Sequence, residues 1–102
     1  MSFTMIIEDE EGRELVRRSH SGNENYLMRD DEEQFPLLSN LNLASYDVFS
    51  CKQAPTLSRE LRLVGSGLDS ADDRDHSEDL AHLVETLGAI EGATITFTPF
   101  KK

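Results

Sequence analysis

The stretch that decides the fold class is Ala93-Thr-Ile-Thr-Phe-Thr-Pro-Phe100, near the end of a 102-residue chain. Apolar side chains alternate in it with three threonines, and this period of two predicts a β-strand with one buried and one solvated face. Pro99 has no backbone N–H to donate, so it marks the edge or the end of the strand. The sheet that contains this strand should therefore have one covered face.

The same period of two appears at the other end of the chain, in residues 3–8. Gly12 follows the acidic residues 9–11, and its freedom to adopt a positive φ suits a tight turn. Residues 13–19 then predict a second strand, although the sequence RELVRR is also compatible with a helix. We predict an antiparallel hairpin with an acidic tip.

The middle of the chain has weaker signals. Residues 19–33 are rich in Ser, Gly, Asn and charge, which indicates mostly loop, with Tyr26–Met28 as a short third strand. Pro36 restricts a regular helix to its first turn, so we expect a helical turn at Pro36–Asn40. Extended chain should follow at Tyr46–Phe49.

A first helix is predicted by Leu57, Leu61 and Val64, which recur at i, i+4 and i+7. Pro55 suits its first turn, and Gly65 stands where a left-handed residue ends many helices.

The second helix has the clearest pattern, because residues 80, 83, 84 and 87 form a narrow apolar stripe. Ser77 or Asp75 should cap its start, and Gly88 or Gly92 should end it. The predicted fold class is therefore α+β: a small antiparallel sheet of three to four strands with two helices packed on one face, in the order β-β-(β)-α-α-β. The chain is long enough for one domain, residues 1–102, and too short for two cores.

The charge balance excludes some classes of partner. Twenty acidic and ten basic side chains give a net charge of -10, which repels nucleic acid phosphates and anionic membrane surfaces. The only basic segment, Lys52–Arg62, is too modest to offset this. The single cysteine, Cys51, excludes an internal disulfide and fits a reducing compartment. The sequence shows neither the pattern of a signal peptide nor an apolar run long enough to span a membrane. We expect a cytoplasmic protein that binds no nucleic acid and no membrane.

No stretch of the sequence has the residue spacing of a catalytic or metal-binding motif. The acidic run DSADDRDHSEDL resembles a calcium loop, but counting from Asp73 puts Glu78 where Gly is required and Val84 where Glu is required. The three histidines lack metal-site spacing, and Cys51 has no nucleophile context, which favours a small buried hydrophobe. We therefore expect no metal, no cofactor, no catalytic residue and no enzymatic activity.

The acidic residues themselves are the remaining clue. They concentrate in residues 8–33, with ten acids and four bases, and in residues 69–85, with seven acids and one base. Such runs are usually solvated, but if both blocks share a face they would steer a basic partner. The candidate partner-binding residues are Asp30, Asp31, Glu32, Glu33, Asp72 and Asp73, with Tyr26 and Tyr46 as exposed aromatic anchors.

The leading hypothesis is a non-enzymatic protein-binding module, a monomer or weak homodimer, that acts on a basic protein partner. Immunity proteins, antitoxins and other inhibitors are commonly small, acidic and single-domain, and this chain is similar to them in size and charge only. The alternative is a small-ligand or regulatory domain with a pocket between the sheet and its helices. A minor enzyme or enzyme subunit is the third possibility.

Overall fold

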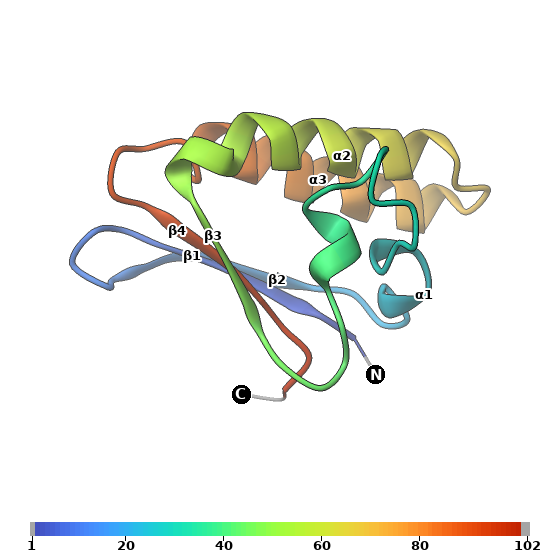
Figure 1. Cartoon of the computed structure of the whole chain (residues 1–102), viewed down its shortest axis with the longest axis horizontal. Helices are drawn as coiled ribbons and strands as arrows, with labels where there is room; N and C mark the ends of the chain where they lie inside the picture. The colour runs from blue at the N-terminus through green and yellow to red at the C-terminus, as the bar shows by residue number, and fades with distance from the viewer. Residues whose placement is uncertain (1, 101–102) are drawn as a thin grey trace.

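The fold is built on a four-stranded antiparallel sheet, seen in a computed structural model that describes residues 2–100 (Figure 1). Its strands are β1 (Thr4–Glu8), β2 (Glu14–Ser19), β3 (Asp47–Ser50) and β4 (Thr94–Thr98), arranged in the order β2-β1-β4-β3. The strand predicted from the threonine alternation is β4. It lies inside the sheet, between the first strand and β3, and Pro99 follows its last residue.

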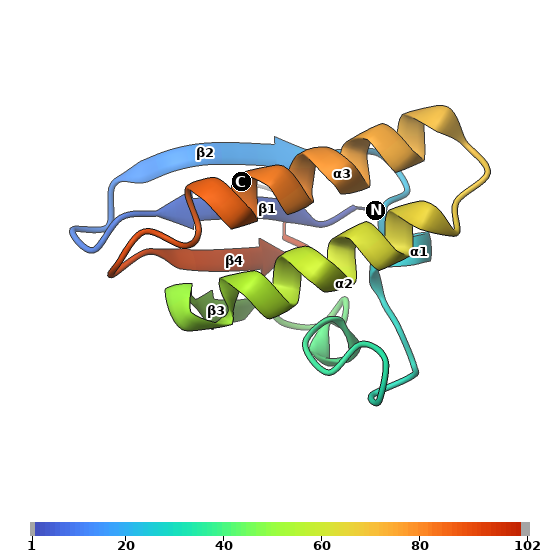
Figure 2. The ribbon, with the colours of Figure 1, turned by 90° about the horizontal axis from the view of Figure 1, so that it is seen from above.

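Two long helices cover one face of this sheet. They are α2 (Ala54–Ser66) and α3 (Ala71–Thr86), and they lie side by side over the sheet, at a slant to the strands (Figure 2). The chain also forms a short helix, α1 (Glu24–Leu27), and two 3-10 turns, η1 (Leu38–Asn40) and η2 (Cys51–Gln53). The predicted α+β class, with two helices on one face of an antiparallel sheet, is confirmed.

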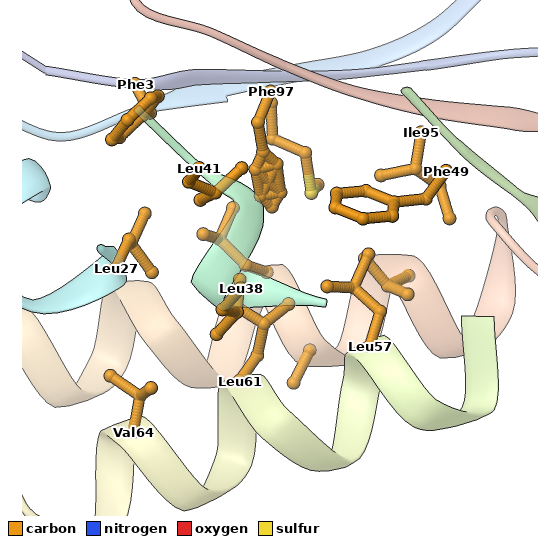
Figure 3. Packing of buried hydrophobic residues seen from close by; sticks show 14 of the residues in the cluster. Phe3, Leu27, Leu38, Leu41, Phe49, Leu57, Leu61, Val64, Ile95 and Phe97 are labelled. Carbon is orange, nitrogen blue, oxygen red and sulfur yellow. The ribbon is translucent and has the colours of Figure 1, made fainter. Parts of the chain in front are cut away.

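A dense apolar core fills the space between the sheet and the helices. Figure 3 shows Leu57 and Leu61 of α2 pointing toward Phe49 of β3 and Phe97 of β4, with Leu38 packed among them. The rings of Phe49 and Phe97 meet edge to face, with centroids 6.1 Å apart. Eighteen buried residues form this one cluster, which joins every layer of the fold.

The hairpin formed by β1 and β2 matches the prediction. Gly12 has a φ of 82° and donates its N–H to the carbonyl of Asp9 at 3.0 Å, which closes the turn. Met5 and Ile7 point into the core, as the alternation predicted. The register shifts between Ile7 and Glu8, so Leu15 of β2 is an extra residue that bulges out of the ladder.

The start of the second helix was predicted wrongly. Ser70, not Ser77 or Asp75, is the N-cap of α3, and its Oγ accepts a hydrogen bond from the N–H of Asp73 at 3.3 Å. Ser77 is fully buried, and its Oγ donates to the carbonyl of Leu61 at 2.7 Å. The first two turns of α3 are polar, so the apolar stripe that signalled the helix begins well after the helix does.

The end of the first helix was also predicted wrongly. Gly65 lies within α2, which continues to Ser66, and its φ is not positive. A Cβ at position 65 would stand 3.4 Å from the Cβ of Ser77. Gly65 therefore lies against α3, where a Cβ would just reach van der Waals contact, and it does not end the helix.

The segment between β2 and α2 was predicted in part. Tyr26 and Leu27 belong to α1 and not to a third strand, because their side chains are anchored in the core as one helical turn. The third strand is β3, which overlaps the extended chain expected at Tyr46–Phe49 and is displaced from it by one residue. The helical turn expected at Pro36–Asn40 is η1.

Candidate functional site

The helices leave one face of the sheet uncovered (Figure 1). Register pairs Ile6 with Arg17 of β2 and with Thr96 of β4, and it pairs Thr96 with Val48 of β3. Directly paired residues point to the same side of a sheet, so one row of side chains crosses all four strands here. We call this surface the open face, and its lining residues are Ile6, Glu8, Glu14, Arg17, Tyr46, Val48, Thr94, Thr96, Thr98 and Phe100.

The open face is hollowed rather than flat. Its side chains surround an open concavity of about 560 Å³. Ile6 is only 5% exposed although no helix lies over it, and Thr98 is also buried. The twist of the sheet and the taller side chains at its edges therefore shelter an apolar patch.

Three large apolar side chains stand exposed around this concavity. Tyr46 is 61% exposed, Val48 is 52% exposed and Phe100 is 48% exposed. The uncovered face of an antiparallel sheet is normally polar, and the threonines of β4 follow that rule. Apolar side chains that gather on one exposed surface often mark a site of interaction.

The opposite side of the concavity is charged. Arg17 Nη2 lies 2.6 Å from Glu14 Oε1, and its Nε lies 3.2 Å from the same oxygen. The hydrogen bond with Glu14, and to a smaller extent the charge of Glu8, raise the pKa of Arg17. One guanidinium therefore faces two carboxylates, and this side of the open face carries a net negative charge.

The acidic hairpin tip extends this negative region. Asp9 Oδ1 accepts the backbone N–H groups of Glu11 and Arg13, each at 2.9 Å, and Asp9 Oδ2 lies 2.9 Å from Arg13 Nε. The hydrogen bond from the Arg13 backbone lowers the pKa of Asp9. Asp9 is therefore committed to the turn, while Glu10 and Glu11 are exposed at the tip, and Glu11 Oε1 lies 3.6 Å from Arg13 Nη2.

The acidic segment Asp30–Glu33 forms an exposed loop between α1 and η1. Asp31 Oδ1 accepts the N–H groups of Glu33 at 3.1 Å and Gln34 at 3.2 Å, which makes Asp31 a turn-forming residue. Phe35, which follows, is buried, and the guanidinium of Arg29 lies 4.6 Å above its ring centroid. The chain enters the core at Phe35, as the sequence suggested.

Asp72 and Asp73 lie in the first turn of α3, where the positive end of the helix dipole favours acids. Asp72 is exposed, and Asp73 Oδ1 lies 3.2 Å from His20 Nε2. Asp73 thus has a contact within the fold, while Asp72 faces solvent.

The acidic segments do not gather on one face. Figure 2 shows the loop that contains Asp30–Glu33 on one side of α2 and α3 on the other side. The hairpin tip lies at the end of the molecule opposite to the connection between α2 and α3 (Figure 1). The shared acidic face that would steer a partner is therefore divided among three places.

The two tyrosines differ in their exposure. Tyr46 is exposed on the open face, as expected of an anchor, whereas Tyr26 is only 6% exposed. The exposure expected of Tyr26 is wrong, because α1 turns its ring into the core. Its hydroxyl is buried and hydrogen bonds to no described residue, and burial raises its pKa to about 12.

Sequence reasoning missed two residues of the open face, Val48 and Phe100. Val48 was grouped with Phe49 as apolar, but neighbours in a strand point to opposite faces, so only Phe49 enters the core. Phe100 follows the threonine side of the last strand. The available signal for Phe100 was the alternation of β4, and for Val48 it was the same period of two applied to β3.

The space between the sheet and the helices, where a ligand pocket was the alternative, is occupied by the apolar cluster. Within residues 2–100, no three histidine, cysteine or acidic side chains converge as a metal ion would require. Over the same residues, neither long helix has the length and hydropathy of a membrane span.

Similarity to known proteins indicates no function for this chain, so the features of the open face are what indicate one. No protein family, curated protein or solved structure matches the chain.

Proposed function

We propose that this protein is a non-enzymatic protein-binding module that binds a basic partner on the open face of its sheet. The observation that carries the proposal is the exposure of Tyr46, Val48 and Phe100 around one concavity. Aromatic side chains bury large areas at little cost in conformational entropy, and such anchors contribute most of the energy of many interfaces.

The charge pattern supports a basic partner. Glu8 and Glu14 outnumber Arg17 on one side of the concavity, and the hairpin tip that joins their two strands carries Glu10 and Glu11. A partner with apolar side chains flanked by Lys or Arg would match both sides of this surface. The net charge of -10 would accelerate its approach, while the apolar anchors would slow its release.

The same charge opposes self-association through the open face, so we propose that the protein is a monomer. We also propose that it acts in the cytoplasm. Inhibition of the bound protein, as in immunity proteins and antitoxins, is the class of action we favour. Asp30, Glu32, Glu33 and Asp72 would contribute to long-range attraction only, because they lie away from the open face.

A small ligand is the second candidate for the same surface. A volume of about 560 Å³ lies within the range of ligand sites. Such sites usually enclose most of their ligand, whereas this concavity is open to solvent, so we place the protein partner first. A thermal shift with a metabolite, unaffected by salt, would favour the ligand instead.

The test is a binding experiment with a purified partner. Immobilised protein is used to capture a partner at low salt, and the captured protein is identified, purified and measured by surface plasmon resonance. The open-face variant Tyr46→Ser/Val48→Thr should weaken binding about 30-fold or more, since a buried anchor contributes about 2 kcal/mol. The control is Leu63→Ser/Ile90→Ser, which removes two other exposed apolar side chains that do not line the open face.

Charge is tested separately. Glu8→Gln should reduce the association rate, and high salt should reduce it further. Amide replacement of Asp30, Asp31, Glu32 and Glu33 should have a smaller effect. If the purified partner binds both apolar double variants equally well, the open face is not the site. A partner without a basic surface would refute the charge argument, and self-association abolished by the open-face variant would identify a homodimer instead.

A further inference from the structure

Two histidines from distant parts of the sequence stack against each other near the start of α3. His20 follows β2 and His76 lies in α3, and their ring centroids are 5.0 Å apart with planes inclined by 25°. Both side chains are half-buried. Neither the acidic blocks nor the open face explains this pair.

Asn23 connects the pair to the first strand. Its Oδ1 accepts the N–H of Phe3 at 2.7 Å, and its Nδ2 donates to the carbonyl of Phe3 at 2.9 Å. These two bonds settle which end of the amide is which, because a flipped amide would oppose both groups of Phe3. Asn23 is 1% exposed, so it has no water to replace these partners.

The fixed amide determines the state of His76. Asn23 Nδ2 lies 3.2 Å from His76 Nε2, and its second hydrogen is available to that nitrogen. Because an amide nitrogen only donates, Nε2 must accept, which requires the neutral imidazole with its proton on Nδ1. A protonated His76 would direct an N–H at the N–H of Asn23.

The charged groups around His76 act in both directions. Burial, and then the neighbouring His20, lower the pKa of His76 to about 4, while Asp79 and Asp73 on its own helix oppose this shift. Asp79 also pairs with Arg18 of β2 at 3.1 Å, and Asp73 lies 3.2 Å from His20. The charges of Asp73 and Glu24 reach the hydroxyl of Tyr26 on α1 and, after burial, contribute to its raised pKa.

We propose that Phe3, Asn23 and His76 form a pH-sensitive clasp, which ties the first strand to α3 while His76 is neutral and opens when His76 is protonated. The stacked ring of His20 adds to the opposition, because it disfavours a positive charge on His76. Opening leaves the N–H and carbonyl of Phe3 without their partner. This proposal goes beyond the proposed function and does not depend on what binds the open face.

The clasp lies next to the first paired residue of the sheet, so its opening should affect the pairing there. Thr4, next to Phe3, pairs with Thr98 of β4, which lies two residues before Phe100. Acidification should therefore loosen the end of the sheet at which Thr4 pairs with Thr98, close to Phe100 of the open face. The hairpin tip at the other end should stay unchanged.

Nuclear magnetic resonance on the intact protein tests the clasp directly. Long-range nitrogen–proton spectra at neutral pH should show His76 as the Nδ1–H tautomer. On acidification, the Asn23 side-chain amide and the backbone amide of Phe3 should shift with the same midpoint as His76, and that midpoint should lie well below 6.5. A proton on Nε2 at neutral pH, or signals of Phe3 that do not follow His76, would overturn the proposal.

A pair of variants separates the clasp from general burial. Asn23→Asp places a carboxylate against His76 Nε2 and should raise the midpoint by about one pH unit or more. Asn25→Asp adds the same charge at an exposed position of α1 and should move it much less. Equal midpoints in the two variants would refute the contact between Asn23 and His76, and if Asn23→Asp fails to fold, the titration of the unmodified protein still decides.

Discussion

Glu60 provides the sharpest test of how the η1 segment is held to the helices. This glutamate of α2 is fully buried, and its Oε1 accepts the backbone N–H of Leu38 at 2.9 Å and of Leu37 at 3.2 Å. Its Oε2 also lies 3.2 Å from the N–H of Leu37. The carboxylate thus supplies hydrogen-bond acceptors to the first turn of η1, whose N–H groups have no other partner in that turn.

We consider the change Glu60→Gln, which keeps the size of the side chain. The amide can accept the N–H of Leu38, but its NH₂ group must then face the N–H of Leu37. A buried donor without a partner costs about 1–3 kcal/mol. For a chain of this size, each kcal/mol lowers the melting temperature by about 4–8 °C.

The cost should depend on pH in a defined direction. Burial raises the pKa of Glu60 above 4.5, and the N–H groups of Leu38 and Leu37 offset part of this. A raised pKa means that the folded state holds the proton more tightly than the unfolded chain. The corresponding stabilisation is fully present below pH 4.5 and is lost as the pH rises through the folded pKa. Glu60→Gln removes this dependence, so its cost should be larger near pH 4.5 than at neutral pH.

Urea unfolding followed by circular dichroism measures this effect at both pH values. The control is Glu78→Gln, the same chemical change at an exposed position of α3, which should alter stability by less than about 0.5 kcal/mol. Other groups that titrate contribute equally to each protein and cancel in the comparison. A cost for Glu60→Gln no larger than that of Glu78→Gln, or one that grows with pH, would refute the reasoning.

Three further predictions concern packing, faces and charge. Gly88→Ala should lower the melting temperature more than Gly67→Ala. A Cβ at Gly88 would stand 2.7 Å from the carbonyl oxygen of Val84, whereas the atom nearest to a Cβ at Gly67 is 3.7 Å away. Equal melting temperatures for the two variants would contradict this. Phe49→Ala should cost about 3–5 kcal/mol in urea unfolding and Val48→Thr less than about 0.5, and similar costs would show that the faces of β3 are misassigned. The pKa of His76 is lowered to about 4, so the stabilisation by neutral His76 is present above pH 6.5 and lost as the pH falls toward 4. His76→Gln removes this dependence and, after allowance for partial exposure, should flatten the pH profile of stability by about 1–2 kcal/mol. An unchanged profile would contradict the prediction.

Parts of the fold followed from local pattern alone. The alternation around Ile95 and Phe97 predicted β4 and its buried face, and the spacing of Leu57 and Leu61 predicted α2. These signals are strong because a strand or helix that packs on a core must repeat its apolar residues at its own period. The start of α3 does not follow from this signal, because Ser70 is a good cap but precedes a polar turn that carries no such period.

Other features depend on partners distant in sequence. Gly65 is of a residue type that commonly ends helices, but it lies inside α2 and faces Ser77 of α3. Tyr26 stands in a polar stretch that favours exposure, yet α1 turns its ring into the core. Neither outcome can be derived from the neighbouring residues, because each is determined by what lies across the fold.

The sequence by itself determined the α+β class, the covered face of the sheet and the net charge of -10, since these depend on local periodicity and composition. Only the tertiary structure decided that the acidic segments lie apart and that Tyr46, Val48 and Phe100 gather on the open face. Strand order and register bring these side chains together from separate segments, and long-range hydrogen bonding between strands sets both. The contact of Asn23 with His76 has the same origin, because it joins residues 53 positions apart through the packing of α3.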